Sequence, residues 1–480
     1  MNFQFPLSKI PLYLVYFILA TVPLLFGAVH PILYGSYVFL VLVGLGSWLC
    51  LFVPEQDPPL LARFWLLPII ILLFFSAFQS MPLPFSWVDL ISPARALRVE
   101  MVNTLAGTEQ NYISISDHGL LSLTRVVLFL ALLVYYLSIK ALMRHDEKII
   151  RILVFIIIAV GVFEALYGIL QFLSPRLGVL WLTRKYAAAC GTIIYKNQYA
   201  SFLNMCWPLS LAVAACYLAD TQHFFKGRKF RSLRERIKRM GGKEKLIPIF
   251  FLATGIILLA VLFSMSRGGM ISMLLVMLLL NVYLPGSRRG KVGFFALFCL
   301  FAIVYGSLLG LDTLVSRFDN IDVAGSSRLK IYMSSLPLLM DHWLSGIGLG
   351  SYSLLSPIYL KGIPSAAHFD KAHNEYLQLA IELGIPAVVL FFTWLSLAMV
   401  LAGKHLFQKR EEEDGKIDFV VVIGGGAFCG LLGFFFHGVA DFGWRLPANL
   451  FYAVTLAALV SHATTKIQGT TGKGQTIKGS

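Results

Sequence analysis

Long, uninterrupted apolar blocks dominate this sequence, and they restrict the chain to a fold that resides in a lipid bilayer. A helix that crosses a bilayer needs about 20 mostly apolar residues, because hydrocarbon offers no partner to an unpaired backbone amide. The 480 residues are 58% hydrophobic and only 14% charged, whereas an ordinary soluble domain is ~25% charged. We therefore predict an all-α integral membrane protein.

Twelve blocks have the length and composition of membrane spans. They lie at residues 11–28, 32–53, 64–80, 119–138, 149–173, 197–218, 247–265, 268–284, 293–310, 384–402, 418–437 and 447–463. The 268–284 block is short, but it adjoins 247–265 through a Gly-Gly turn, so we expect a helical hairpin there. We thus expect about 12 transmembrane helices, and an even number places both termini on one side of the membrane.

The basic residues indicate which side carries the termini. If both ends are cytoplasmic, most of the 40 Lys and Arg residues fall on the cytoplasmic side, as the positive-inside rule requires. The net charge of +15 then reflects membrane orientation, and we expect no nucleic-acid partner. The first apolar run lacks a small-residue cleavage site, so we expect a retained first helix and no signal peptide.

The spans and loops divide the chain into three parts. Residues 1–184 hold the first five spans and a non-cytoplasmic loop at 81–118. Residues 185–463 form the core, with the longest loop at 311–383, and loops of that length in a compact protein are usually functional. Residues 464–480 are rich in Gly, Thr and Lys, and we expect a disordered cytoplasmic tail there.

The longest loop is predicted to be partly helical. Ser326 and Ser327 precede Arg328 and an amphipathic stretch that runs to about Met340, and a serine there suits the N-cap of a helix. Three glycines within 346–350 then mark a turn. A second helix is expected over 372–383, so two short helices should form a roof over a cavity in the membrane bundle.

The cytoplasmic loop at 222–246 carries an apolar stripe among many Lys and Arg residues. One interpretation is an interfacial helix on anionic lipid. The other is a solvated basic loop that obeys the positive-inside rule. The sequence does not decide between them.

The six cysteines and ten histidines indicate neither disulfides nor a metal centre. Five cysteines fall inside or at the ends of predicted spans, where a free cysteine behaves as a small hydrophobe, and no C-x-x-C pair occurs. The histidines lack a metal-ligand spacing such as H-E-x-x-H. We expect no tightly bound metal and no cofactor.

Two arginines on the non-cytoplasmic side are candidates for anion binding. Arg267 lies at the tip of the predicted hairpin, on the side where cations are under-represented, and Arg328 opens the predicted loop helix. A helix N-terminus favours anions, and a guanidinium adds a bidentate fork for phosphate. The alternatives are an arginine that reaches the lipid headgroups for Arg267 and a solvated loop arginine for Arg328.

His373 is the candidate general base. It lies in the run Ala372–Tyr376, at the predicted start of the second loop helix. A histidine titrates near neutrality and accepts a proton from a hydroxyl, although a lone loop histidine is more often a polar surface residue. His368, five residues earlier, is a competitor.

Two further polar groups belong to the same side of the membrane. Lys196 and Arg184 form a basic patch where a loop meets the sixth span, unless they are interfacial anchors. His437, Asp441 and Arg445 surround the last external turn, and we interpret them as a structural group with an Asp–Arg pair. Several cations and one base facing one compartment suit glycan transfer from a polyprenyl-diphosphate carrier, because cations would bind the diphosphate and a base would deprotonate the attacking hydroxyl.

At these residues the chain resembles the O-antigen ligase and polymerase superfamily of bacterial envelope glycosyltransferases. The resemblance is strongest over roughly 185–450 and rests on the order of several short motifs. These are Lys196–Ala200, Ser266–Gly268, Arg328, Gly346–Gly350, His373–Tyr376, Leu383–Pro386 and Asp441–Pro447. Lys196 is a departure, since relatives often have arginine there, which puts a bidentate grip at that position in doubt.

The resemblance implies a fold, a location and a reaction. The fold is a helical membrane protein of the bacterial inner membrane with a large periplasmic loop, and the reaction is inverting, metal-independent transfer of a glycan from undecaprenyl diphosphate. By the resemblance, Arg267 and Arg328 would bind the diphosphate and His373 would activate the acceptor hydroxyl. The expected substrate-binding residues are Lys196, Arg184, Asn374, Tyr376, Asp441 and Arg445.

Four functions remain open at this point. The leading one is a ligase that moves the glycan to an acceptor such as lipid A core. A polymerase that extends the glycan on its own carrier would use the same donor. A transporter would place polar residues near the bilayer midplane, often in inverted repeats, and the spans here are nearly free of charge. A scaffold would depend on the basic cytoplasmic loop for docking partners.

Overall fold

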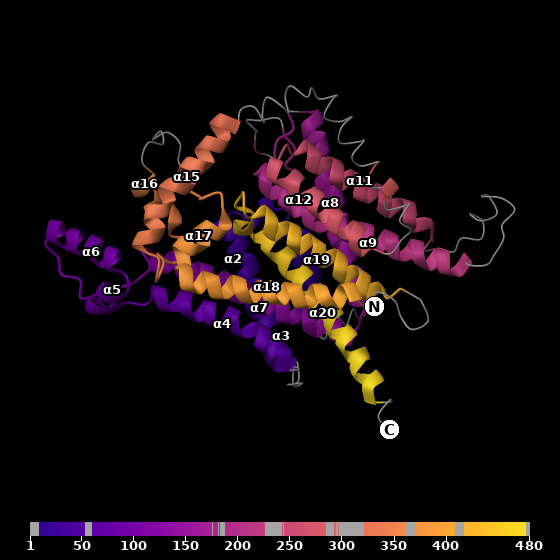
Figure 1. Ribbon diagram of the computed structural model, residues 1–480, viewed down its shortest axis with the longest axis horizontal. Helices are drawn as coiled ribbons and strands as arrows, with labels where there is room; N and C mark the ends of the chain where they lie inside the picture. The colour runs from indigo at the N-terminus through magenta and orange to yellow at the C-terminus, as the bar shows by residue number, and fades with distance from the viewer. Residues whose placement is uncertain are drawn as a thin grey trace, which may run out of the picture.

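The computed structural model describes residues 9–52, 60–174, 176–180, 182, 188–225, 242, 244–284, 292–293, 296, 321–360, 370–408 and 417–476. Helices dominate this part of the chain, as predicted (Figure 1). The one sheet in it has two short antiparallel strands, β1 (Leu83–Pro84) and β2 (Tyr112–Ile113), with Leu83 opposite Ile113.

The apolar helices form a bundle. In chain order they are α1 (Ile10–Thr21), the 3-10 turn η2 (Phe26–Ala28), α2 (Pro31–Phe39), the π-helical η3 (Leu40–Leu45), α3 (Gly46–Phe52), α4 (Leu60–Ser80), α7 (Gly119–His145), α8 (Lys148–Leu173), α9 (Lys196–Phe225), the 3-10 turn η4 (Glu244–Leu246), α11 (Ile247–Phe263), α12 (Arg267–Tyr283), α18 (Ile385–Gln408), α19 (Phe419–His437) and α20 (Pro447–Thr476).

Seven helical stretches within the described residues are long and apolar enough to cross a membrane. They are Pro31–Leu51, Gly119–His145, Lys148–Leu173, Lys196–Thr221, Ile385–Phe407, Phe419–His437 and Pro447–Gln468, and the shorter apolar helices are Ile10–Thr21, Leu66–Ser80, Ile247–Phe263 and Arg267–Tyr283. Each coincides with a predicted span, and the remaining predicted span, 293–310, lies outside the described residues except for positions 293 and 296. The protein is a multi-pass, all-α membrane protein.

Successive helices run in opposite directions between two ends of the bundle, which we name the site end and the far end. At the site end, the Thr192 hydroxyl donates to the carbonyl of Pro23, just after α1, at 2.8 Å. At the far end, the ammonium of Lys466 lies 3.1 Å from a carboxylate oxygen of Glu147, just before α8. Because α1 starts and α20 finishes at the far end, both ends of the described chain lie on the same side.

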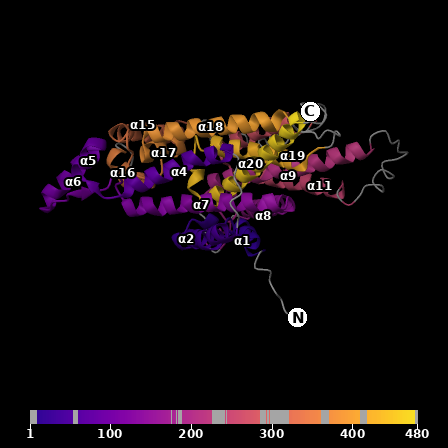
Figure 2. The ribbon, with the colours of Figure 1, turned by 90° about the horizontal axis from the view of Figure 1, so that it is seen from below.

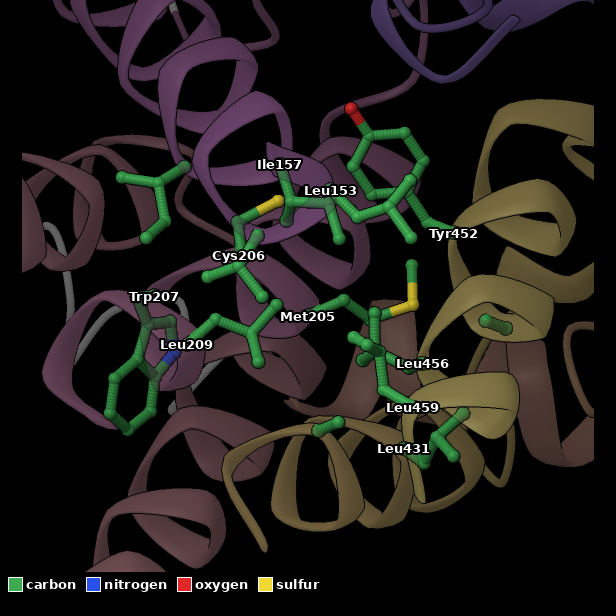
Figure 3. Close-up of a cluster of buried hydrophobic side chains, with 14 of the residues drawn as sticks. Leu153, Ile157, Met205, Cys206, Trp207, Leu209, Leu431, Tyr452, Leu456 and Leu459 are labelled. Carbon is green, nitrogen blue, oxygen red and sulfur yellow. The ribbon is translucent and has the colours of Figure 1, made fainter. Parts of the chain in front are cut away.

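The core lies where α8, α9, α19 and α20 meet (Figure 3). Figure 3 shows Leu153 and Ile157 of α8, Met205 and Cys206 of α9, and Leu456 of α20 in one apolar cluster, and all five are buried. Residues from predicted spans far apart in sequence thus share one core. The five cysteines among the described residues form no disulfide with one another.

Three helices from the longest loop cover the site end: α15 (Ile321–Asp341), α16 (Tyr352–Tyr359) and α17 (Glu375–Leu383) (Figures 1 and 2). The predicted start of the first helix is wrong, because α15 begins at Ile321 and Ser326 lies inside it. The α15 helix has apolar residues on more than one face, so its pattern does not reveal which face is buried: Ile331 and Leu338 are buried, whereas Leu329 is 60% exposed.

The predicted glycine turn between α15 and α16 is confirmed. Gly346, Gly348 and Gly350 all have positive φ, a region that favours glycine. Gly348 also lies so close to Ser116 that a Cβ would come within 2.2 Å of the Ser116 hydroxyl oxygen. Its backbone N–H donates to the carbonyl of Glu382 at 2.9 Å, which fixes the turn against the end of α17.

The loop at 81–118 contains α5 (Phe85–Ile91) and α6 (Pro93–Ala106), which lie beside α16 at the site end (Figure 1). A polar cluster fastens α6 to α15. The guanidinium of Arg98 lies 3.0 Å from a carboxylate oxygen of Asp117 and 3.0 Å from Nε2 of His342. The carboxylate of Asp117 also binds Arg95 at 3.0 Å. Residues 81–118 are therefore a folded part of the roof.

Two further predictions need correction. The predicted tail at 464–480 is helical as far as Thr476, because α20 continues past its apolar part, and residues 477–480 lie outside the described chain. The hairpin of α11 and α12 is confirmed, but its turn is Ser264–Ser266, not the glycine pair. Ser266 caps α12 by accepting from the backbone N–H of Gly269 at 3.2 Å. The basic loop at 222–246 lies largely outside the described residues.

Candidate functional site

Five segments bring the predicted site residues together at the site end. They are the starts of α9 and α12, the helix α15, the residues that lead into α17, and the connection between α19 and α20 with its 3-10 turn η5 (Gly443–Arg445). The backbone N–H of Glu375 donates to the carbonyl of Gly438 at 2.9 Å, which joins the start of α17 to the end of α19. Residues more than sixty positions apart thus form one polar group.

Asp441 is the centre of this group. Its side chain is 3% exposed, and one carboxylate oxygen accepts from the backbone N–H of Phe442 at 2.8 Å. The other oxygen accepts from the side-chain amide of Asn197 and lies 3.5 Å from the guanidinium of Arg328. Burial alone would raise the pKa of Asp441, but contacts with His373, His437 and Arg328 lower it below its ordinary value, so the carboxylate stays ionised.

His373 lies beside this carboxylate, with Nδ1 3.9 Å from Oδ1 of Asp441. Its ring packs edge-on against Phe442, at 4.8 Å between centroids, and its carbonyl accepts from the hydroxyl of Tyr332 at 2.9 Å. The residue has a φ of +53°, a strained backbone for a side-chain-bearing residue and one that is frequent at functional sites. A carboxylate at Nδ1 orients a histidine ring so that Nε2 is the basic nitrogen.

The prediction that His373 opens the loop helix is corrected by two residues. Asn374 is the N-cap of α17, because its side-chain oxygen accepts from the backbone N–H of Leu377 at 3.0 Å. His373 precedes the cap and is 23% exposed. The competitor His368 lies outside the described residues.

Arg328 reaches the site from α15. Its guanidinium donates to the carbonyl of Ala440 at 2.7 Å and approaches Asp441 at 3.5 Å, while 38% of its side chain is exposed. It lies in the second turn of α15 and not at the start, because the helix begins at Ile321. The expected contribution of a helix N-terminus to anion binding is therefore absent at Arg328.

Arg267 is the first residue of α12, so this arginine is the one at a helix N-terminus. The next residue, Gly268, packs against the ring of His437, where a Cβ would lie 2.9 Å from Nε2. Lys196, at the start of α9, donates from its ammonium to the carbonyl of Met265 at 3.3 Å. Lys196 and Arg267 thus stand at adjoining helix starts beside the Asp441 group.

His437 itself is 2% exposed, and both of its ring nitrogens lack a hydrogen-bond partner among the described residues. It is the last residue of α19 and precedes Asp441 by one turn of chain. The sequence analysis already placed His437 in one group with Asp441, and the electrostatic interaction between the two side chains agrees with that grouping.

The expected Asp441–Arg445 pair is not what the structure shows. Arg445 lies instead between two buried carboxylates, with 2.9 Å to Glu375 and 2.9 Å to Glu382. Burial would lower the pKa of Arg445, but the two carboxylates raise it, so the guanidinium remains charged. Its role in the described chain is to clamp η5 against α17, next to His373.

Of the remaining predicted site residues, Tyr376 and Asn374 lie within the described chain and Arg184 does not. The hydroxyl of Tyr376 donates to the carbonyl of Phe435 at 3.0 Å, and its ring packs on Phe392 and Trp444. Burial, aided by Glu375, raises the pKa of Tyr376 to about 12. Tyr376 and Asn374 therefore hold α17 in place, and Arg184 lies outside the described residues.

Sequence reasoning did not assign Asn197 or the Glu375–Glu382 pair to the site. A signal existed for the carboxylates, since Glu375 and Glu382 are seven residues apart, and that spacing places both on one face of a helix. Asn197 gave no such signal, because its partner, Asp441, is 244 residues away in sequence.

The comparison with curated proteins found no match to this chain. A family model described as O-antigen ligase matches residues 252–392. The matched region begins in α11, ends in α18 and includes Arg267, Arg328 and His373, whereas Lys196 and Asp441 lie outside it. The resemblance predicted from the short motifs is confirmed over residues 252–392, where this multi-pass membrane protein matches the O-antigen ligase family.

Proposed function

We propose that the protein is a glycan ligase of the bacterial inner membrane that works on the periplasmic face. It would transfer a polysaccharide from undecaprenyl diphosphate to a hydroxyl of an acceptor such as lipid A core, with inversion and without a metal ion. The observation that carries this proposal is the position of the Asp441 carboxylate between Arg328 and His373, with Arg267 on the adjoining helix start. The family domain supports the general class of reaction.

In the proposed reaction, His373 takes the proton of the acceptor hydroxyl. The hydroxyl oxygen then forms a bond to the anomeric carbon of the glycan, while the bond from that carbon to the diphosphate oxygen breaks. Attack opposite the leaving group gives inversion. The diphosphate leaves with the carrier lipid, and Arg267 and Arg328 stabilise its negative charge.

Asp441 has a positioning role in this scheme. Its carboxylate fixes the ring of His373 and stabilises the imidazolium that forms when His373 accepts the proton. It also holds Arg328 through a weak 3.5 Å contact. The 2.7 Å hydrogen bond to the carbonyl of Ala440 holds the guanidinium more firmly, and the exposed part of the side chain would meet the diphosphate.

The test is reconstitution of the purified protein with lipid-linked glycan, with and without acceptor. The ligase proposal predicts acceptor-linked glycan only when acceptor is present. Longer carrier-linked chains without added acceptor would instead establish the polymerase alternative. The His373→Ala, Arg267→Ala and Arg328→Ala variants should each lose transfer, by about 10²-fold or more for the base.

Two matched variants control for the loss of charge. Arg176→Ala removes an exposed arginine outside the site group, and Lys371→Ala removes a cation two residues from His373. Both should keep wild-type transfer. Full transfer by His373→Ala and Arg267→Ala would contradict the catalytic assignment and favour a transporter. Loss of function only on mutating the loop at 222–246 would favour a scaffold.

A further inference from the structure

A large, partly open cavity lies between four helices of the bundle, with further lining from α1, α3 and α19. The helix α4 packs on α7, α7 on α20, α20 on α18, and α18 on α4, so they form a closed ring (Figures 1 and 2). The cavity has a volume of about 1820 Å³. Pockets for drug-sized ligands usually measure ~300–1,000 Å³, so this one has room for a larger molecule.

The walls of the cavity are almost wholly apolar. They include Leu66 and Ile69 of α4, Leu132 of α7, Leu395 of α18 and Val454 of α20. Such walls suit hydrocarbon chains, because a polar ligand would lose its hydrogen bonds to water without replacement. Arg267, Arg328 and His373 do not line the cavity, although Arg445 and Glu375, which lie next to His373, form its site end.

The far end of the cavity is basic. Lys140 lines it and is 9% exposed, within a helix that is apolar enough to cross the membrane. Arg144, one turn further along the same face of α7, and Lys9 line the same cavity, against the single carboxylate of Asp146. An ionisable residue at membrane depth indicates a functional site by default.

The neighbours of Lys140 leave its charge without an anion among the described residues. The ammonium donates to the hydroxyl of Ser461 at 2.6 Å, and a hydroxyl is a neutral acceptor. At the site end of the cavity the cations are already engaged: Arg445 lies between Glu375 and Glu382, and Arg125 lies over the ring of Tyr34. The excess positive charge of the cavity is therefore at the far end.

We propose that this cavity binds one anionic phospholipid from the far-end leaflet, with its phosphate at Lys140 and Arg144 and its acyl chains between α4, α7, α18 and α20. The phosphate oxygens would accept charge-assisted hydrogen bonds from the two side chains. The acyl chains would fill apolar space that water does not occupy favourably. The site does not depend on the proposed glycan transfer.

The test uses the full-length protein, purified in detergent, stripped of lipid and incubated with phosphatidylglycerol or phosphatidylcholine of the same acyl chains. Native mass spectrometry then measures the lipid retained per protein. Wild type should retain one phosphatidylglycerol in preference to phosphatidylcholine. Lys140→Gln should reduce that retention about tenfold, as expected for one charge-assisted contact, and Lys140→Arg should keep it.

Two further variants separate the headgroup from the chains. Ala457→Trp places a bulky ring in the cavity wall and should abolish retention of both lipids while all the cations remain. Lys148→Gln removes an exposed cation that does not line the cavity and should behave as wild type. The unfolding temperature without lipid checks that each variant is folded. The proposal would be overturned if folded Lys140→Gln or Ala457→Trp retained as much phosphatidylglycerol as wild type. Equal retention of both lipids by wild type would also overturn it. So would co-purification of a polyprenyl lipid in the cavity.

Discussion

Asp441 receives contacts from three different segments of the chain, through Asn197, Arg328 and His373. Each of these contacts is favourable because the carboxylate is ionised. Its pKa lies below the ordinary value despite burial. An amide of the same shape would keep most of the packing but would not stabilise a protonated His373. A substitution by asparagine therefore tests the effect of the carboxylate's charge with little change in its volume.

We expect Asp441→Asn to lower kcat for glycan transfer by about 10²-fold, the order that a well-placed general base contributes. The unfolding temperature should change much less, because Asn197 and Phe442 still have a polar partner. The matched control is Asp370→Asn, which removes an exposed carboxylate paired with Lys371. Transfer within about threefold of wild type would contradict the positioning role.

His342 provides a prediction about pH. Burial, together with Arg98 and Arg95, lowers its pKa to about 4, and Arg98 donates to Nε2, which requires a neutral ring. An unfolded histidine titrates near 6.5. The stability from this site is therefore fully present above pH ~6.5 and is lost as the pH falls towards 4, by up to about 3 kcal/mol.

The check is the unfolding temperature of the detergent-purified protein between pH 7.5 and 4.5. His342→Gln should be less stable at neutral pH and should show a shallower loss on acidification. His145→Gln, which removes an exposed histidine, should follow the wild-type curve. Parallel curves for wild type and His342→Gln would mean that His342 does not carry this pH dependence.

Residue identity could be predicted from the sequence better than residue pairing. The candidates Arg328, His373 and Asp441 were all chosen from the sequence, and the structure brings them together. The expected pairing of Asp441 with Arg445 was wrong, because two residues four apart share a face only in a helix, and η5 begins after Asp441. The partners that Asp441 contacts in the structure lie in distant segments of the chain, and the spacing of neighbouring residues cannot predict such contacts.

At the scale of elements, α17 and η5 depend on one buried ionic group. The side chains of Glu375 and Glu382 are 1% and 0% exposed, and Arg445 binds both. Gln378 adds a hydrogen bond of 3.0 Å to Glu382. Removing the cation would leave two carboxylates buried next to each other, which is far more costly than removing the whole group.

We expect Arg445→Met to destabilise the protein by about 3–5 kcal/mol. Adding Glu375→Gln and Glu382→Gln should restore a large part of that loss, because the buried negative charges are then gone. Denaturant unfolding in detergent measures both effects, with Arg176→Met as the control for an exposed arginine. If the triple variant were less stable than Arg445→Met alone, the ionic explanation would fail.

Helix positions in the bundle were predictable because apolar blocks of about 20 residues have few alternatives in lipid. Helix starts in the roof were not. The first loop helix begins at Ile321, and the serine expected as its cap lies inside it. The second starts at Glu375 because the side chain of Asn374 supplies the cap. Where several polar residues lie near a helix start, the sequence does not determine which of them is the N-cap.

At the scale of the whole molecule, the described helices of the bundle alternate in direction between the site end and the far end. The α12 helix finishes at the far end, where the Tyr283 hydroxyl donates to the carbonyl of Val421 at 2.7 Å near the start of α19. The helices α15, α16 and α17 lie at the site end (Figure 1). The sequence alone could not place these ends relative to the Asp441 group, since that requires contacts such as Asp117 to Ile347 across the roof.

Membrane orientation is the last prediction, and it decides whether the site end is periplasmic. In a background with Cys50→Ser and Cys299→Ser, we expect Asn111→Cys and Lys371→Cys to react with a membrane-impermeant maleimide in cells whose outer membrane alone is permeable. Both positions belong to the site end. His145→Cys, at the far end, should react only after the inner membrane is broken, as the basic residues at that end require.

The remaining described cysteines are buried and should not react, which the parent background verifies. Labelling of His145→Cys before lysis, with protection of Asn111→Cys, would place the site end in the cytoplasm. His373 and its arginines would then face the wrong compartment for a lipid-linked glycan that is used outside the cell. Labelling of Asn111→Cys and Lys371→Cys from opposite sides would contradict the fold itself, because α6 and α15 are joined through Arg98 and His342.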